Sequence, residues 1–270
     1  MLSMRPRKSW PARARDWCYS RLGGRWITDH WMPSAAISSQ TIAFTYHGRP
    51  LSVQADAGTP LYETIAELVD RDAYQLERIP WPDNRAFTVI DIGANIGVSA
   101  LLFAQHAGAR VIAVEPVPDN ARRLRENLTR NQVASVTVLE AAVAAARGAA
   151  SFEVNPRATV GGRLAAAEAP GPRITVPTLT WQDLRAQAGD TAPFLVKMDC
   201  EGGEYAILDS MSDEELRAIP CLTFELHDLD RTHRMERVVD RLARCGFALT
   251  YQPDLFHRPY LHHVLALRPA

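Results

Sequence analysis

The sequence predicts an α/β protein built on a mostly parallel seven-stranded sheet with an antiparallel last strand. Three observations predict this fold: strand-like apolar runs alternate with helical patterns from about residue 87, a glycine-rich turn follows the first run, and the loop between the last two runs is too short for a crossover helix. A chain of 270 residues with 47% hydrophobic and 23% charged residues suits one main core.

The chain divides into an N-terminal extension, residues 1–83, and a main domain, residues 84–270. The extension begins with a basic arm to about Ser39 that contains four tryptophans and is interpreted as docked or loosely ordered. A β-hairpin is predicted from Thr41 to Val53, followed by a helix from Leu61 to about Arg78. The predicted buried face of this helix holds Leu61, Ile65, Leu68 and Val69.

Seven runs are predicted to form the main sheet, each rich in β-branched or aromatic residues. They are Phe87–Ile92, Arg110–Glu115, Ser135–Glu140, Phe194–Asp199, Cys221–Leu226, Phe247–Tyr251 and His263–Leu267. A β insertion is predicted between the third and fourth, with short strands at Ala149–Val154, Thr159–Leu164 and Ile174–Leu179. Its tip at 169–172 either covers an acceptor pocket or decorates the surface. The last two strands, joined by the 252–261 loop, should be antiparallel neighbours.

Composition and charge restrict the partners and the compartment. A net charge of −1 gives no electrostatic reason to expect nucleic acid or a membrane as the main partner. No apolar run is long enough to span a bilayer, and no signal-peptide core follows the basic N-terminus. The four cysteines lack C-x-x-C spacing, which fits reduced thiols. We therefore expect a cytoplasmic protein, and association into a homo-oligomer is left open.

The turn after the first strand is the strongest local signal for a ligand site. In Val89-Ile90-Asp91-Ile92-Gly93-Ala94-Asn95-Ile96-Gly97, an apolar run ends in an acid and two glycines, and an apolar helical pattern follows. Glu115 ends the second strand, where a carboxylate can accept hydrogen bonds from both ribose hydroxyls of an adenosine. This order of elements predicts a nucleotide-type cofactor site.

The spacing and charge of the turn discriminate between cofactors. Dinucleotide sites usually carry G-x-G-x-x-G, whereas Gly93 and Gly97 are spaced G-x-x-x-G and Asp91 precedes them. An anionic Asp91 repels a pyrophosphate and attracts an ammonium or hydroxyl groups. S-adenosylmethionine has an adenosine, a sulfonium and an ammonium but no phosphate, so it fits this pattern better than NAD(P).

Several motifs together resemble the FkbM family of S-adenosylmethionine-dependent methyltransferases. They are Val89–Gly97, Val114-Glu115-Pro116 with Pro118, Asn127 with Asn131, and the K-x-D-x-E-G-x-E signature from Lys197 to Glu204. The match runs from about Phe87 to His227, more than half of the chain, and the motifs occur in the family's order. The resemblance implies a class I methyltransferase fold and S-adenosylmethionine as the cofactor.

The resemblance also implies roles for individual residues. It assigns Asp91, Gly93, Asn95 and Gly97 to the methionine end of the cofactor, Glu115 to the ribose, and Glu140, Ala141 and Ala142 to the adenine. Methyl transfer to a hydroxyl requires alignment and removal of a proton. Lys197, Asp199 and Glu201 end the fourth strand at the sheet edge where such sites lie, and they are candidate catalytic residues. Glu204 is expected instead to serve the first turn of the next helix.

A histidine is the second candidate for the general base, and the same strand ends have an alternative role as metal ligands. His227 stands beside Glu225 and Asp228 at the end of the fifth strand and competes with Glu201 for the role of general base. The acids and histidine at the two strand ends could instead ligate a divalent cation, although none is expected. The other histidines considered have no evident partner in the sequence and are interpreted as surface or structural residues: His233, His257, His262 and His263.

The sequence therefore predicts an O-methyltransferase that acts on a hydroxyl of a small metabolite or a glycan. The alternatives are an NAD(P)-dependent oxidoreductase and a non-catalytic S-adenosylmethionine-binding protein. Nucleic-acid methylation is disfavoured, because Asp199-Cys200-Glu201-Gly202 replaces the Asn/Asp-Pro-Pro-aromatic element that grips a flipped base.

Overall fold

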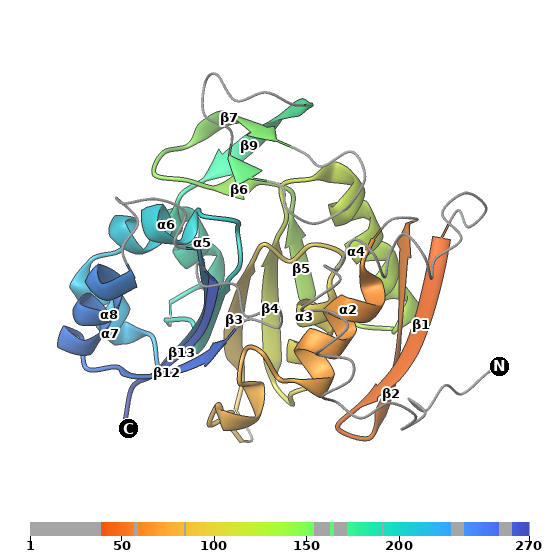
Figure 1. Cartoon of the computed structure of the whole chain (residues 1–270), viewed down its shortest axis with the longest axis horizontal. Coiled ribbons are helices and arrows are strands. Elements are labelled where there is room, and N and C mark those ends of the chain that lie inside the picture. Colours follow the sequence, from red (N-terminus) through yellow and green to blue (C-terminus); the bar gives the residue numbers. More distant parts are fainter. Residues whose placement is uncertain are drawn as a thin grey trace, which may run out of the picture.

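The computed structural model describes residues 39–56, 59–83, 85–153, 163–164, 172–190, 192–227, 235–253 and 261–269. Its centre is a seven-stranded sheet in the order β12-β13-β11-β10-β3-β4-β5 (Figure 1). The strands are β3 Phe87–Ile92, β4 Ala109–Val114, β5 Val136–Leu139, β10 Leu195–Met198, β11 Cys221–His227, β12 Ala248–Pro253 and β13 Leu261–Leu267. All seven strand predictions are confirmed, with shifts of one or two residues at their ends.

Strand direction also agrees with the sequence. The five strands β11, β10, β3, β4 and β5 run parallel to one another, whereas β13 is antiparallel to both β11 and β12. The fold is thus a mostly parallel α/β sheet in which the last strand inserts between β11 and β12. Because the carboxyl ends of β3, β4, β10 and β11 meet at one edge, residues that follow these strands come together there.

Helices cover both faces of the sheet, and strand alternation separates two cores. Val89 and Val111 face one core, whereas Ile90 and Ile112 face the other. The first core is covered by the N-terminal hairpin, α2 Leu61–Ile65, η1 Ala66–Asp70, α3 Val98–Phe103 and α4 Pro118–Arg130 (Figure 1). The second is covered by α5 Trp181–Ala188, α6 Glu204–Ser210, α7 Asp213–Ala218 and α8 Met235–Arg244.

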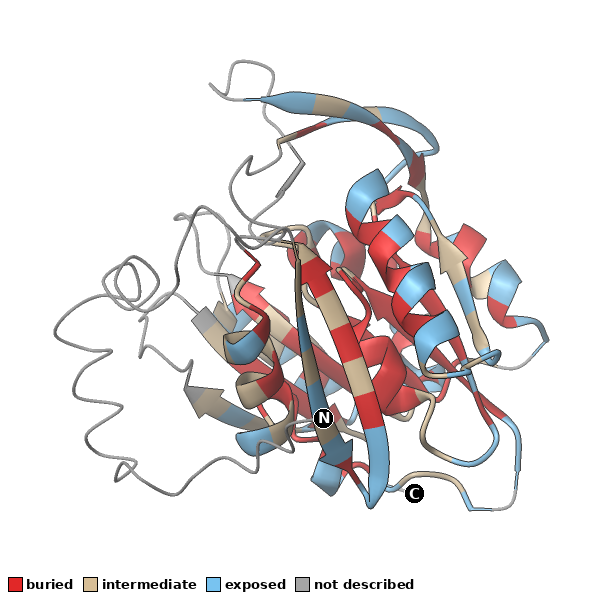
Figure 2. Cartoon of the chain, turned by 90° about the vertical axis from the view of Figure 1, so that its right-hand side faces the viewer, coloured by how far each residue is buried: buried red, intermediate tan, exposed pale blue. Residues whose placement is uncertain are grey.

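The predicted hairpin is confirmed as β1 Ser39–Tyr46 and β2 Arg49–Asp56, joined at His47-Gly48. Burial alternates along β2, as Figure 2 shows, because one face of the strand packs on the first core and the other does not. Apolar side chains of the hairpin share that core with Val89 of the main sheet; they include Tyr46, Leu51 and Val53.

Two asparagines of α4 bond to the edge of β2. Asn131 accepts from the Ser52 amide at 2.8 Å and donates to the Ser52 carbonyl at 2.7 Å. Asn127 does the same with Gln54, at 2.8 and 3.0 Å, and also donates to the Ile96 carbonyl at 2.9 Å. The two side chains, one helical turn apart, therefore satisfy alternate residues of the strand and tie the hairpin to the turn after β3.

The prediction of one helix from Leu61 to about Arg78 is wrong in its second half. The helical segment ends at Asp70, with α2 passing into the π-type turn η1, and a short 3-10 turn, η2 Leu76–Arg78, follows. Asp72 and Gln75 have φ angles of +49° and +54°, which interrupt a right-handed helix. The Asp72 carboxylate accepts hydrogen bonds from the amides of Leu76 and Glu77, and this local bonding competes with helix continuation.

The predicted insertion forms a small separate sheet of order β6-β9-β7-β8. Its strands are β6 Ala142–Val143, β7 Gly148–Glu153, β8 Arg163–Leu164 and β9 Arg173–Leu179. The basic arm at 1–38 and all but the last residue of the predicted tip at 169–172 lie outside the described residues. Within the ranges that the structure describes, no helix is long and apolar enough to cross a bilayer.

Candidate functional site

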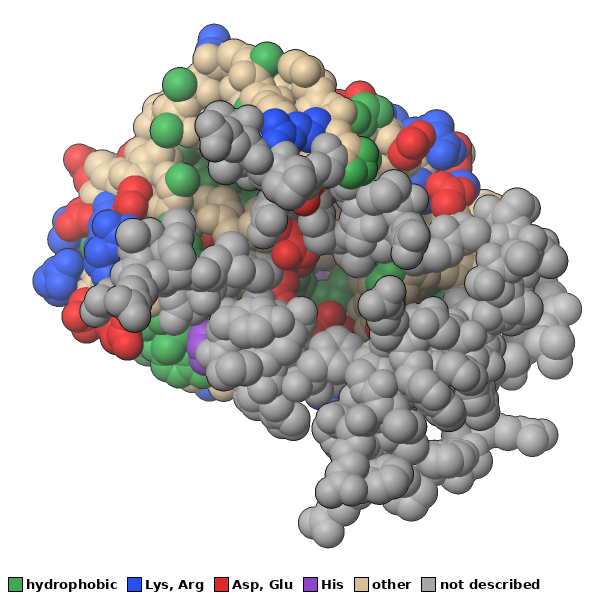
Figure 3. Space-filling view, turned by 45° about the horizontal axis from the view of Figure 1, so that its top comes forward, with side chains coloured by type: hydrophobic (Ala, Val, Ile, Leu, Met, Phe, Trp, Pro, Cys, Tyr) green, Lys and Arg blue, Asp and Glu red, His purple; other side chains and the backbone are tan. Residues whose placement is uncertain are grey.

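A cavity opens at the carboxyl edge of β3, β4 and β10, and Figure 3 shows acidic side chains gathered in a hollow of this face. Seven residues predicted as site residues line it: Gly93, Asn95, Glu115, Ala141, Ala142, Asp199 and Glu201. The remaining lining residues are Ile92, Val114, Pro116, Val117, Asn120, Val143, Phe152, Cys200 and Gly203. Because the lining segments follow four different strands, the sheet itself brings them together.

The turn after β3 needs glycine for steric reasons at two positions. A Cβ on Gly93, where φ is +75°, would lie 1.8 Å from the Asp199 carbonyl oxygen, so only glycine allows the two strand ends to meet. A Cβ on Gly97, where φ is +91°, would lie 2.9 Å from the Leu124 Cγ of α4. Gly97 is not among the cavity-lining residues; it permits α4 to pack against the turn.

Asn95 and Glu115 form the polar wall of the cavity. Asn95 has a φ of +50°, and its amide donates to Glu115 Oε2 at 2.8 Å. The other carboxylate oxygen accepts from the Val117 amide at 3.0 Å and from Asn120 Nδ2 at 3.2 Å. Burial raises the pKa of Glu115 to about 7, although these donors oppose the rise. The Asn95 Oδ1 is buried and has no hydrogen-bond partner among the described residues, so the wall offers a free acceptor.

Asp91 and Lys197 lie behind the cavity rather than in its lining. Both are almost fully buried; Lys197 Nζ lies 3.1 Å from Asp91 Oδ1, and Ser99 Oγ donates to Asp91 Oδ2 at 2.6 Å. Lys197 Nζ also donates to the Gly93 carbonyl at 2.8 Å. Burial opposes the charge on Lys197, but attraction to Asp91 and Asp199 outweighs it and raises the lysine pKa. The pair thus fixes the turn that forms the cavity floor.

Glu204 lies in the first turn of α6, as predicted, and its side chain also holds the loop after β10. The Glu204 carboxylate accepts from the Cys200 amide at 2.7 Å and from the Gly202 amide at 2.9 Å. Within this loop Glu201 has a φ of +54°, a conformation that non-glycine residues adopt at a cost. Both Asn95 and Glu201 therefore line the cavity from left-handed backbone positions. Burial raises the pKa of Cys200 well above its ordinary value, so its thiol stays neutral.

The segment after β5 contributes an apolar wall. Ala141 and Ala142 are buried and line the cavity together with Phe152 of the insertion. Glu140 does not line it: its carboxylate pairs with Arg125 Nη1 of α4 at 3.0 Å on the surface. Of the three residues expected after β5, only the two alanines face the cavity.

A second polar group, which we call the acid–histidine cluster, comprises Glu67, Tyr74, Asp199, Glu225 and His263. Tyr74 donates its hydroxyl to Asp199 Oδ2 at 2.7 Å, and His263 Nε2 lies 3.3 Å from Glu67 Oε1. Burial, followed by repulsion from Asp199, raises the pKa of Glu225 well above its ordinary value. Asp199 belongs to this cluster and also lines the cavity, so the two sites adjoin.

Sequence reasoning set His263 aside and did not single out Glu67 or Tyr74 as site residues. These residues are distant in sequence, and η1, the 72–75 turn and the β11–β13 register bring them together, with Glu225 opposite His263. One signal in the sequence could have revealed His263. It stands two residues before Leu265 in the same strand, so the two side chains point to the same, buried face. His227 ends β11, but its side chain and Asp228 lie outside the described residues.

The charge of the cavity lining restricts what it can bind. Three carboxylates, Glu115, Asp199 and Glu201, line it, and no lysine or arginine does so within the described part of the chain. Such a lining repels a phosphate and suits a ligand with hydroxyl, ammonium or sulfonium groups. The orphaned Asn95 Oδ1 and the open acceptor sites of Glu115 fit an adenosine-containing cation, so the residues present suit S-adenosylmethionine.

Comparisons with known proteins match the chain to a family model, to curated relatives and to solved structures. The model of the methyltransferase FkbM domain matches residues 91–249. The chain is 31% identical over 214 residues to the 31-O-demethyl-FK506 methyltransferase FkbM of Streptomyces tacrolimicus, covering 67% of this chain and 81% of that protein. It is 31% identical over 137 residues to the hexuronic acid methyltransferase AglP of Haloferax volcanii, covering 51% and 54%. A solved methyltransferase FkbM from Methylobacillus flagellatus aligns with a TM-score of 0.47 and 18% identity, covering 72% and 47%.

Proposed function

The chain belongs to the FkbM methyltransferase family, and on that premise we propose that it transfers a methyl group from S-adenosylmethionine to a hydroxyl of a small metabolite or a glycan. The observation that carries the proposal is the cavity lining, with three carboxylates, a free amide oxygen and no basic side chain among the described residues. No basic side chain of the lining among the described residues would offset the repulsion of a pyrophosphate by these carboxylates, which argues against an NAD(P)-dependent oxidoreductase.

We assign the cofactor's parts to the walls that suit them. Glu115 is the acceptor for the ribose hydroxyls, and Asn95 adds its free side-chain oxygen beside it. Ala141, Ala142 and Phe152 supply an apolar wall for the adenine. Gly93 and the loop that follows β10 are left for the methionine end. Asp91, placed there by the family resemblance, acts instead through Lys197 and the turn in this proposal.

The chemistry asked of the protein is modest. The bound cofactor supplies a methyl group on a positively charged sulfur. The acceptor oxygen forms the new bond to that methyl carbon, the old carbon–sulfur bond breaks, and the acceptor proton passes to a base. Glu201, which lines the cavity, and His227, at the end of β11, are the candidate bases. Lys197 is a positioning residue, because it holds the Gly93 turn rather than facing the cavity.

Two parts of the proposal are drawn from the relatives: that the acceptor atom is an oxygen, and that the acceptor is a small molecule or a sugar. The names of two relatives state a 31-O-demethyl substrate and a hexuronic acid, respectively. We extend methylation of a hydroxyl on a small molecule or sugar to this chain, with no nucleic-acid partner. A cytoplasmic location is part of the proposal and is supported by Cys200, Cys221 and Cys245, which are free thiols.

Calorimetry with S-adenosylmethionine tests the donor, and Glu115 provides a paired comparison. We expect Glu115→Gln to weaken binding about ten- to a hundredfold, because a charge-assisted hydrogen bond is lost. Glu140→Gln should change it little, since that strand-end carboxylate pairs with Arg125 outside the cavity. Absence of saturable binding by the wild type would refute the proposal, and NAD⁺ binding in its place would favour an oxidoreductase.

The acceptor requires a separate assay. Methyl-labelled cofactor incubated with cell extract and the purified chain should yield a labelled small molecule or glycan that is stable to mild base, as an ether is. Glu201→Gln should lower the yield by a larger factor than it weakens cofactor binding, because the base acts only in the transfer step. Binding with no labelled product in any extract would indicate a cofactor-binding protein without activity.

A further inference from the structure

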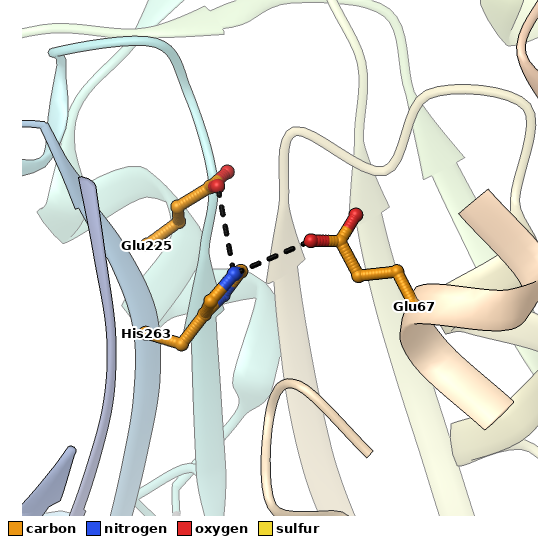
Figure 4. Close-up of side chains that lie close together, drawn as sticks. All are labelled: Glu67, Glu225 and His263. Atoms are coloured by element: carbon orange, nitrogen blue, oxygen red, sulfur yellow. Dashed lines mark ion pairs between the residues drawn. The ribbon is translucent and has the colours of Figure 1, made fainter. Parts of the chain in front are cut away.

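Three members of the acid–histidine cluster converge from separate elements. Glu67 comes from η1, Glu225 from β11 and His263 from β13, and Figure 4 shows the two carboxylates pointing toward the imidazole. His263 Nε2 lies 3.3 Å from Glu67 Oε1 and 3.8 Å from Glu225 Oε1. One donor atom from each residue lies within 4.8 Å of the other two.

The state of His263 itself points to a ligand. Its side chain is 2% exposed, and neither ring nitrogen makes a hydrogen bond with a described residue. The imidazole nitrogen and the Glu67 carboxylate oxygen therefore lie 3.3 Å apart without the angles that a hydrogen bond requires. Burying an imidazole whose nitrogens form no hydrogen bond costs free energy. An Nε2 atom that points at two carboxylates is, in contrast, the arrangement of ligand atoms that a metal site requires.

The surrounding charge favours a cation in the same place. Asp199 adds a third carboxyl group beside Glu225, and among the described residues the ammonium of Lys197 that pairs with Asp199 is shared with another acid. Lys197 Nζ lies 3.1 Å from Asp91 Oδ1 but 3.9 Å from Asp199 Oδ2. The lysine is thus engaged mainly by Asp91 and only at longer range by Asp199.

We propose that Glu67, Glu225 and His263 bind one divalent first-row transition-metal cation, of which Zn²⁺ and Mn²⁺ are the representatives. Metal–ligand bonds of about 2.1 Å place neighbouring ligand atoms roughly 3.0 to 3.5 Å apart in octahedral or tetrahedral shells. The distance of 3.3 Å lies in this range and that of 3.8 Å just above it, so small side-chain adjustments would bring the three groups to bonding distance, with water in the remaining positions. An imidazole among carboxylates favours these cations over Ca²⁺ and Mg²⁺.

A cation held there would lie beside Asp199, which also lines the cofactor cavity, and would be available to an acceptor hydroxyl. That use rests on the proposed methyl transfer, whereas binding of the cation does not. The test therefore measures binding alone, on the full chain without cofactor or acceptor.

The experiment titrates the chelator-stripped, dialysed chain with Mn²⁺ and follows the loss of the free-ion electron paramagnetic resonance signal, with Zn²⁺ as competitor. We expect saturable binding of one ion per chain that Zn²⁺ displaces. His263→Gln and Glu225→Gln should each weaken it at least about tenfold. The exposed pair His47–Glu77, 2.7 Å apart, provides matched controls of the same residue types, and His47→Gln and Glu77→Gln should leave binding unchanged.

Variants of buried residues can unfold, so circular dichroism accompanies each titration and Glu67→Gln provides a third variant. Glu67 is 29% exposed at its side chain and lies on η1, so its substitution is the mildest for the fold. A folded Glu67→Gln chain with weakened binding supports the site. Absent binding in the wild type, or equal affinity in the wild type and a folded Glu67→Gln chain, would overturn the proposal.

Discussion

The two polar sites at the carboxyl edge of the sheet are built in different ways. The cavity is lined mainly by short continuous segments that each follow a strand, and its geometry depends on backbone turns at Gly93 and Glu201. The acid–histidine cluster is made of side chains that come from distant parts of the chain. A site made of turns can be found in a sequence, whereas a site made of convergent side chains becomes visible only when the register is known.

Substitution of Gly93 should give the largest effect, because it alters the backbone contact on which the cavity depends. In Gly93→Ala the new Cβ would lie 1.8 Å from a main-chain oxygen of Asp199, so one strand end must move. We expect a loss of more than about 4 kcal/mol in the free energy of unfolding, or failure to fold.

Gly48 is the matched control for this measurement by urea denaturation. Its φ of +76° equals that of Gly93 within a degree, yet nothing lies within 4 Å of its would-be Cβ. Gly48→Ala should therefore cost only the conformational term, about 1 to 2 kcal/mol. Equal losses in the two variants would show that the close approach to Asp199 is unimportant.

Removal of the Lys197 ammonium should cause the second-largest loss of stability. Lys197→Met keeps an unbranched side chain but leaves Asp91, which is 0% exposed, without its cationic partner. We expect the free energy of unfolding to fall by about 3 to 5 kcal/mol. Thr223→Val removes only a neutral hydrogen bond, from the residue opposite Lys197 on β11, and should cost about 1 kcal/mol. Comparable losses would mean that the ion pair is not the stabilising feature of the turn.

The pH dependence of stability should show the contribution of Glu115. Its pKa is raised by burial from 4.5 to about 7, so the native state holds this proton more tightly than the unfolded chain. The stabilisation is complete below about pH 4.5 and is lost as the pH rises through about 7, amounting to about 3 kcal/mol. Glu115→Gln cannot titrate, so the difference between the two unfolding curves isolates this term. A difference that does not vary between pH 4.5 and 8 would contradict the raised pKa.

Glu201 should give the smallest change in stability. Glycine suits its φ of +54°, so Glu201→Gly relieves backbone strain while adding flexibility to the unfolded chain, and the two terms nearly cancel to within about 1 kcal/mol. Glu201→Gln keeps the strain and serves as the control. Both variants should lose methyl transfer if the carboxylate is the base. Full activity in Glu201→Gly would transfer that role to another residue.

The strands, their directions and seven of the sixteen cavity-lining residues were predictable from the sequence, because alternation and glycine turns are local signals. The helix prediction failed after Asp70, since left-handed residues at Asp72 and Gln75 are hard to foresee from apolar spacing. The sequence placed Asp91 among the cofactor-binding residues, whereas the structure buries it behind the turn, where it pairs with Lys197 from another strand. Glu140 points outward because Arg125 of α4 lies there, a contact made in three dimensions.

The hydrogen bonds of Asn127 and Asn131 to β2 restrict how copies of this chain can associate through the hairpin. A hairpin ordinarily offers two edges to an incoming strand. Here Asn127 and Asn131 occupy the donors and acceptors of Ser52 and Gln54, so the helix stands in for a third strand along β2. Strand addition at the hairpin is thereby directed to the outer edge of β1. Asn127 also joins the β2 edge to the Ile96 carbonyl, so a hairpin pulled from its helix would also disturb the turn beneath it.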